Sequence, residues 1–247
     1  MFRYYFYQKL NKRSRKIKMI QQKKYFQNLS NLLNSELLTH INLELDLHID
    51  SHGVQNLAQV LLQCSNMQIL ALDLSVNNIY TDYGINSEAA LDLVSTLAKC
   101  DKLSNLTLDF YGNSLFDNNC SFSKKLSSAF TKFQNLKRLC LSLQRSSMRI
   151  ADYFELGSGF AKCTKLQILE LDLFDNRINE KGEANLISTL FKCNQLIYLY
   201  LIIQQVVFLS NQFFFSFLLS FTYLLIKNFF INKKDFKQKN QLQSYIK

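Results

Sequence analysis

Apolar residues recur along the chain in six short segments that share one spacing. Each segment is apolar at its first residue and again three, five and seven residues later. The last three of these positions alternate with other residues, which is typical of a strand with one buried face. Between the segments, apolar residues return every three or four positions and predict a helix with one buried side. The segments begin at Leu38, Met67, Leu103, Leu136, Leu166 and Leu196.

The segments follow one another at intervals of 29 to 36 residues, and self-similarity at such a period indicates a solenoid of stacked units. Each unit leaves one side of its strand and helix uncovered, so stacking on neighbours completes the core. We therefore predict an α/β fold of about six right-handed strand-turn-helix units, with a concave parallel sheet and convex helices. Polar residues predict where helices begin, at Ser87, at Ser121, and at Asp152 with Glu155.

Two of the segments, MQILALDLSVNNI and LQILELDLFDNRI, resemble leucine-rich-repeat proteins of the ribonuclease-inhibitor type, particularly the large set of protist members. The resemblance covers roughly residues 29 to 205. An asparagine follows the strand pattern at Asn77, Asn113 and Asn176, two residues later than in the general consensus. Some relatives carry a protein-kinase domain. This chain has no glycine-rich phosphate loop, HRD or DFG, so the resemblance implies no kinase activity.

Charge and hydropathy divide the chain into four parts. We expect a basic N-terminal tail at 1–28, a leucine-rich-repeat domain at 29–205, an uncharged Phe/Leu-rich segment at 206–226 and a basic C-terminal tail at 227–247. Residues 1 to 35 carry nine cations and no acid, residues 36 to 205 have a net charge of −4, and residues 206 to 247 have +5. We interpret the N-terminal tail as a solvated segment. Its binding to nucleic acid, to an acidic surface or to an import receptor is the less favoured alternative.

The segment 206–226 is 21 residues long and has no charge, which is enough to span a bilayer. Three interpretations stay open: a membrane helix that anchors the repeats, an apolar cap on the solenoid, or translated non-coding sequence that truncates a larger repeat protein. The start of the chain has no apolar run of signal-peptide length. The cysteines Cys64, Cys100, Cys163 and Cys193 share one repeat position, as buried thiols would. We therefore expect a cytoplasmic protein, with membrane association as the alternative.

The sequence offers no catalytic or metal constellation. The three histidines, His40, His48 and His52, lie near two aspartates but without a recognised ligand spacing. The Gly157-Ser158-Gly159 tripeptide is not a nucleophile elbow. We expect no enzyme activity, no metal and no cofactor.

The outward strand positions line the concave face and therefore hold the candidate binding site. Counted from the first apolar residue of each segment, one such position is acidic in four of the six, at Glu44, Asp73, Asp109 and Asp172. Tyr111 and Phe174 follow two of these acids by two residues and are expected to be exposed anchors. We predict an interaction module that binds a protein, through a basic segment, along this face. The alternatives are that the acids are an ordinary solvated surface and that the aromatics only pack on each other.

Overall fold

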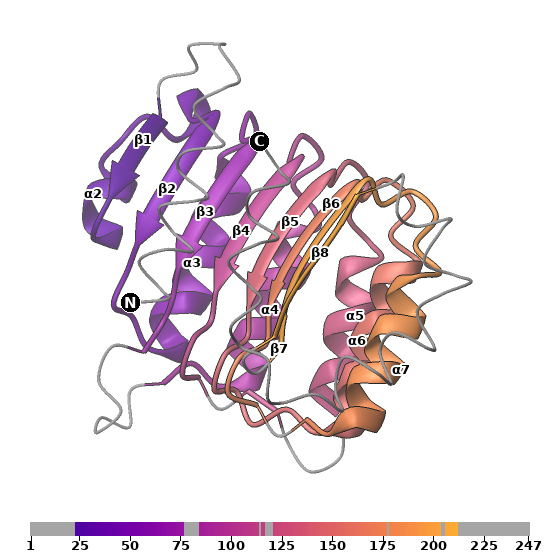
Figure 1. Ribbon diagram of the computed structural model, residues 1–247. Coiled ribbons are helices and arrows are strands. Elements are labelled where there is room, and N and C mark those ends of the chain that lie inside the picture. Colours follow the sequence, from indigo (N-terminus) through magenta and orange to yellow (C-terminus); the bar gives the residue numbers. More distant parts are fainter. Residues whose placement is uncertain are drawn as a thin grey trace, which may run out of the picture.

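The computed structural model describes residues 23–76, 84–113, 115–116, 121–176, 178–203 and 206–211. They form one sheet of eight strands in the order of the chain, as Figure 1 shows. Strands β1 to β7 are parallel to their neighbours, and β8 pairs antiparallel with β7. The strands are β1 (Lys23–Phe26), β2 (Asn42–Asp46), β3 (Ile69–Asp73), β4 (Asn105–Asp109), β5 (Arg138–Ser142), β6 (Ile168–Asp172), β7 (Tyr198–Ile203) and β8 (Val206–Asn211).

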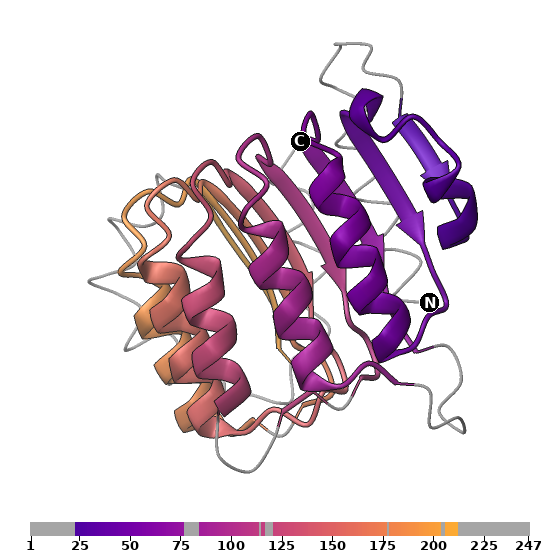
Figure 2. The same cartoon turned by 180° about the vertical axis from the view of Figure 1, so that it is seen from behind.

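The helices alternate with the strands and lie together on one side of the sheet (Figure 2). Successive helices from α3 to α7 pack side by side. This arrangement confirms the predicted α/β solenoid with helices outside and a parallel sheet inside. The helices are α2 (Leu29–Leu33), the short 3-10 helix η1 (Leu37–Thr39), α3 (Ser51–Gln63), α4 (Ser87–Leu97), α5 (Ser121–Phe130), α6 (Ile150–Ala161) and α7 (Glu180–Leu190).

The core lies between the sheet and the helices and runs without a break through the repeats. One leucine from each of six adjacent strands stands in register, and every one of them is at most 1% exposed. Because each leucine packs between those of neighbouring units, the units cannot be buried independently. This row consists of Leu45, Leu72, Leu108, Leu141, Leu171 and Leu201.

The turns after the strands are held by buried asparagines. Asn113 donates from Nδ2 to the Leu74 carbonyl of the preceding repeat at 2.9 Å and to its own Phe110 carbonyl at 3.1 Å. Asn176 makes the equivalent pair of bonds, to the Leu143 carbonyl of the preceding repeat and to its own Leu173 carbonyl. The preceding residue adopts the left-handed conformation in both repeats, at Gly112 and at Asp175. Asn77, the third predicted asparagine, lies outside the described residues.

The first repeat has a different register from the predicted one. Leu43 and Leu45 pair with Leu70 and Leu72, so Asp46 and not Glu44 stands opposite Asp73. The unit therefore begins two residues later than its sequence pattern suggested. His40 takes the first core position and is 2% exposed, whereas Leu38 is 63% exposed. A shift of two residues keeps every side chain on the same face, so the alternation of apolar positions could not detect it.

Two of the predicted helix starts also move by a few residues. The N-cap of α4 is Asn86, whose side chain accepts from the Ala89 N–H, and Ser87 is the first helical residue. In α6, Asp152 accepts from the Arg149 N–H at 2.9 Å and does not form a box with Glu155. Asp152 also accepts from the Ser123 hydroxyl of α5 at 2.8 Å, which ties the two helices together. Ser121 is the first residue of α5.

Cys64, Cys100, Cys163 and Cys193 are free thiols at equivalent ends of the repeats. Burial raises the pKa of Cys64 and Cys100 to about 11 and that of Cys163 and Cys193 to about 12. Thiols held protonated in this way are poor nucleophiles and metal ligands. These four cysteines therefore serve as small core residues.

Both ends of the predicted repeat domain adjoin further strands. Residues 23–26, within the segment expected to be a tail, form β1 beside β2. Residues 206–211, which begin the segment 206–226, form β8. The remainder of both segments, 1–22 and 212–226, and the C-terminal part 227–247 lie outside the described residues. No helix in the described part of the chain is both long and apolar enough to cross a bilayer.

Candidate functional site on the concave face

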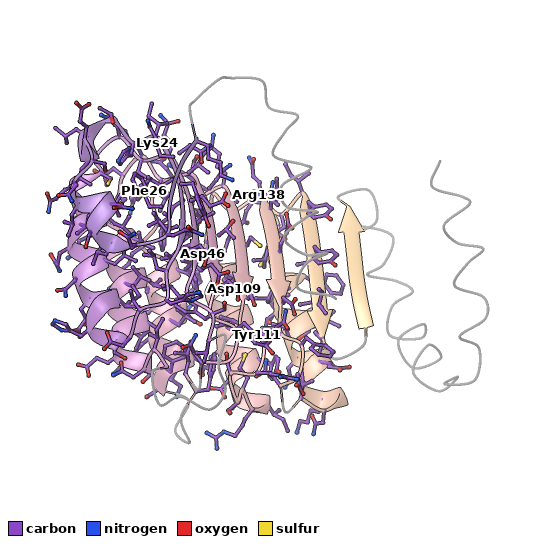
Figure 3. All side chains as sticks on the ribbon, turned by 90° about the vertical axis from the view of Figure 1, so that its left-hand side faces the viewer. Lys24, Phe26, Asp46, Asp109, Tyr111 and Arg138 are labelled. Atoms are coloured by element: carbon purple, nitrogen blue, oxygen red, sulfur yellow. The ribbon has the colours of Figure 1, made fainter. Side chains whose placement is uncertain are left out.

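Alternate side chains of the strands project from the face opposite the helices. At the carboxyl ends of five adjacent strands these side chains form one row that we call the acidic row. Figure 3 shows Asp46 and Asp109 of this row toward the end of the strands where Tyr111 lies, whereas Arg138 lies at the other end. The acidic row consists of Asp46, Asp73, Asp109, Ser142 and Asp172.

Three aspartates of the row close their own strands. The Oδ1 atoms of Asp73 and Asp109 each accept from the backbone N–H two residues later at 2.9 Å, and Asp172 does so at 3.1 Å. A short side chain that accepts from this N–H stabilises a turn where the ladder ends. These aspartates thus have a structural role, which the sequence analysis did not identify. The sequence feature that could have indicated this role is an aspartate that recurs at the last position of several strands.

The exposure of the acidic row changes along the sheet. Asp46 and Asp73 are half-buried, whereas Asp109 is 4% and Asp172 2% exposed. The alternative that these acids are an ordinary solvated surface therefore does not describe Asp109 and Asp172, which are buried. Burial raises the pKa of Asp172 to about 6, and the charge of Asp109 adds to this. Hydrogen bonds from the Phe174 N–H and from Gln144, at 2.6 Å, act in the opposite direction.

Other carboxylates on this face are paired with cations. Glu44 lies one row nearer the start of the strands and forms an ion pair with Lys23 of β1. Glu170 accepts from the Arg138 guanidinium at 2.6 Å. These two acids have cationic partners within the chain, and both lie one row nearer the start of the strands than the acidic row.

The predicted aromatic anchors are half-buried, not exposed as expected. The Tyr111 hydroxyl accepts from Arg145 at 3.0 Å, and the Arg145 guanidinium carbon lies 5.7 Å from the centre of the Tyr111 ring. On the last strands an apolar cluster forms on the concave face, apart from the main core. We call it the aromatic cluster, and it comprises Cys140, Phe174, Tyr200 and Ile202.

Ser142 lies in the acidic row between Asp109 and Asp172. Its side chain is 1% exposed, and its hydroxyl has no hydrogen-bond partner. A buried hydroxyl without a partner costs about 1 to 3 kcal/mol. Within the described residues the same is true of His40 Nδ1 and the Tyr153 hydroxyl, which lie away from the acidic row. The sequence pattern gave no sign of the buried Ser142 hydroxyl, because this is simply a residue without charge at a position that is acidic in other repeats.

Of the residues considered for catalysis and metal binding, Gly157, Gly159 and His40 take structural positions, and His48 and His52 are exposed. Gly157 and Gly159 lie inside α6, where they allow close approach of α7 and α5. His40 is buried beside Phe26, with its Nε2 atom 2.7 Å from the Ser35 hydroxyl oxygen. Within the described ranges, no three His, Cys, Asp or Glu side chains are grouped as metal ligands.

No protein-family model and no curated protein matches the sequence. Among solved structures, one match is the tropomodulin C-terminal domain from Caenorhabditis elegans. It has 10% sequence identity and a TM-score of 0.41, and the alignment covers 69% of this chain and 83% of that one. A likeness this distant does not bear on function, so the functional argument depends on the geometry of the concave face.

Proposed function

We propose that this chain is a non-catalytic interaction module that binds a basic, partly aromatic segment of another protein along the concave face. The observation that carries the proposal is the acidic row, which strand register places across adjacent strands at one end of the sheet. Of the predicted site residues, Asp73, Asp109 and Asp172 belong to it, and Asp46 takes the place predicted for Glu44.

Electrostatics favours a cationic ligand at this row. Adjacent strands lie about 4.8 Å apart, and two carboxylates at that distance repel each other by roughly 0.8 kcal/mol even in water. The repulsion grows as the groups become buried, and Asp109 is one of the causes of the raised pKa of Asp172. A lysine or arginine placed along the row would relieve it. The half-buried Asp46 and Asp73 are the members best placed for direct contact.

The surroundings of the row favour a ligand with apolar side chains as well. Tyr111 and Phe174 come two residues after the row, in the turns that follow β4 and β6, and are each half-buried. Half-buried aromatics beside a binding surface can become fully buried when a partner binds, and aromatic anchors of this kind contribute much of the binding energy of interfaces. From β2 to β6 the row spans about 19 Å, the length of about six extended residues.

Selection of peptides by display against the full chain tests the proposal. We expect the selected peptides to be rich in Lys and Arg and to contain an aromatic residue. They should bind at least 10-fold more weakly when Asp46, Asp73 and Asp109 are changed together to Asn, which keeps the oxygen with which Asp73 and Asp109 close their strands. A matched control changes three exposed acids near the helices, Glu88→Gln, Asp92→Asn and Asp101→Asn. Peptides without a cationic preference, or equal loss in both variants, would refute the concave site.

A further inference from the structure

The concave face differs in chemistry from one side to the other. On β2 to β4 the acidic row has three consecutive aspartates, Asp46, Asp73 and Asp109. On β5 to β7 the face carries the aromatic cluster, in which Cys140 is 0% and Ile202 8% exposed. A segment that crosses the whole face should therefore be cationic on the side of β2 and aromatic on the side of β7.

The first 22 residues of this chain have that composition in that order. Counted backwards from β1, they contain a cationic run and then an aromatic run, and they contain no acid. β1 is the edge strand next to β2, and the cationic run precedes β1 in the sequence. The cations are Lys9, Lys12, Arg13, Arg15, Lys16 and Lys18, and the aromatics are Phe2, Tyr4, Tyr5, Phe6 and Tyr7.

Chain length permits this match. Lys18 is five residues before Lys23, where β1 begins. Fully extended, 22 residues reach about 70 Å, and the distance from β1 to β7 is only about 29 Å. A short connection gives a high effective concentration and a small closure cost.

We infer that residues 1–22 bind in cis to the concave face, with the cationic run on the acidic row and the aromatic run on the aromatic cluster. The inference rests on the proposed function and names an occupant of the same site. An external basic segment must then displace the chain's own segment, so the module is autoinhibited.

The basic C-terminal segment is the rival occupant, and two features favour the N-terminal one. The cationic run contains Arg13 and Arg15, and a guanidinium pairs with carboxylates through two hydrogen bonds, whereas the C-terminal cations are all lysines. The first of those lysines, Lys227, is 16 residues beyond the end of β8 at Asn211. The C-terminal cations must therefore close a longer loop to reach the acidic side.

Two full-length variants with the same number of substitutions test the inference. The first changes the six cations from Lys9 to Lys18 to Gln. The second changes the six C-terminal lysines to Gln, at Lys227, Lys233, Lys234, Lys237, Lys239 and Lys247. A synthetic peptide of residues 1–22, added in trans, should bind the first variant at least 10-fold more tightly than it binds the natural chain or the second variant. The acidic-row Asn substitutions, added to the first variant, should abolish that binding.

Carbodiimide cross-linking of the natural chain supplies a second measurement. We expect links within one molecule from Lys12, Lys16 or Lys18 to Asp46 or Asp73. A gain in peptide binding by the second variant, or cross-links from the C-terminal lysines, would overturn the inference in favour of the rival. Equal binding to all three chains, with no such cross-links, would also overturn it.

The same variants separate this inference from the proposed function. If display-selected peptides bind the natural chain and the first variant equally, and lose affinity with the acidic-row substitutions, the proposed function stands and autoinhibition is wrong. If those peptides are insensitive to the acidic row, the proposed function is wrong. The cross-links then decide whether residues 1–22 contact the face.

Discussion

The Asn176 side chain donates from Nδ2 to the Leu143 carbonyl of the preceding repeat at 2.7 Å. The same group donates to Leu173, and its Oδ1 atom accepts from the N–H groups of Ser146 and Met148 at 3.0 and 3.1 Å. One buried amide thus satisfies backbone groups on both sides of a repeat boundary. The solenoid is held together at this edge by polar contacts as well as by leucines.

Replacing Asn176 by Ala should lower the free energy of unfolding by about 3 kcal/mol, because several buried backbone groups lose their partner. Urea denaturation measures the change. Asn194→Ala is the control, since this side chain is exposed, and it should stay within about 0.5 kcal/mol of the natural chain. Similar stabilities for the two variants would show that the asparagine does not link the repeats.

Leu171→Asp tests whether the leucine row is one cooperative core. The side chain is 0% exposed, and an unpaired buried charge should cost about 4 kcal/mol or more. Because neighbouring units share this row, several repeats should unfold together in circular dichroism and thermal melting. Leu33→Asp, at a half-exposed position, is the control. A small local loss of signal in Leu171→Asp would contradict the shared core.

Gly159→Ala should force α5 and α6 apart. A Cβ atom at position 159 would lie 2.4 Å from the Ser127 Cβ and 2.7 Å from its Cα, so the backbone would have to move. We expect the free energy of unfolding, measured by thermal denaturation, to fall by about 1 to 3 kcal/mol. At Gly84 the nearest atom would be 3.7 Å away, so Gly84→Ala should be close to neutral. Equal effects would mean that the helix spacing adapts at no cost.

Asp172→Asn should change how stability depends on pH. Its folded pKa, about 6, exceeds the ordinary value of 3.8, so the folded chain holds a proton that the unfolded chain releases between those values. The protonated carboxyl therefore contributes to stability, and this contribution is fully present below about pH 4 and is lost as pH rises through about 6. The Asn variant does not titrate. Its Oδ1 atom still accepts from the Phe174 N–H, and its Nδ2 group donates to Gln144 once that side-chain amide turns to present its oxygen. It should therefore be more stable than the natural chain above pH 6, by up to about 3 kcal/mol.

Urea denaturation at several pH values between 4 and 7.5 checks this prediction. The stability difference between the two chains should approach zero at the acid end and grow through pH 6. Asp175→Asn, which changes a carboxylate that is half-exposed, is the control for a general charge effect. A constant difference across the range would show that Asp172 does not gain a proton on folding.

The sequence was enough to predict the six strands β2 to β7 and their helices, because the alternation of leucines reports directly which face is buried. It was not enough for β1, since Lys23–Phe26 is short and begins with two lysines. The register of β2 was missed because apolar residues alternate without a break from Ile41 to Leu47, so the strand pattern fits a unit that begins at Leu38 as well as one that begins at His40. Periodicity identifies the face of a strand and not the partner opposite each residue.

The candidate site was predictable only in part, for the same physical reason. Residue type and spacing placed Asp73, Asp109 and Asp172 on one row. They did not reveal that each closes a turn with one oxygen, since that depends on where the strand ends. Neither did they reveal the burial of Asp109, or that Ser142 is buried without a partner, because exposure depends on neighbours in space.

Binding of a display-selected peptide at two salt concentrations tests the central claim most directly. The natural chain, the acidic-row variant of Asp46, Asp73 and Asp109, and the helix-side control of Glu88, Asp92 and Asp101 are compared at about 50 and 300 mM salt, between which exposed charges become strongly screened. For the natural chain and the control, we predict a Kd that rises at least 10-fold with salt. The acidic-row variant should bind weakly at both concentrations and respond little to salt. A salt response that is unchanged in the acidic-row variant would contradict binding at the concave face.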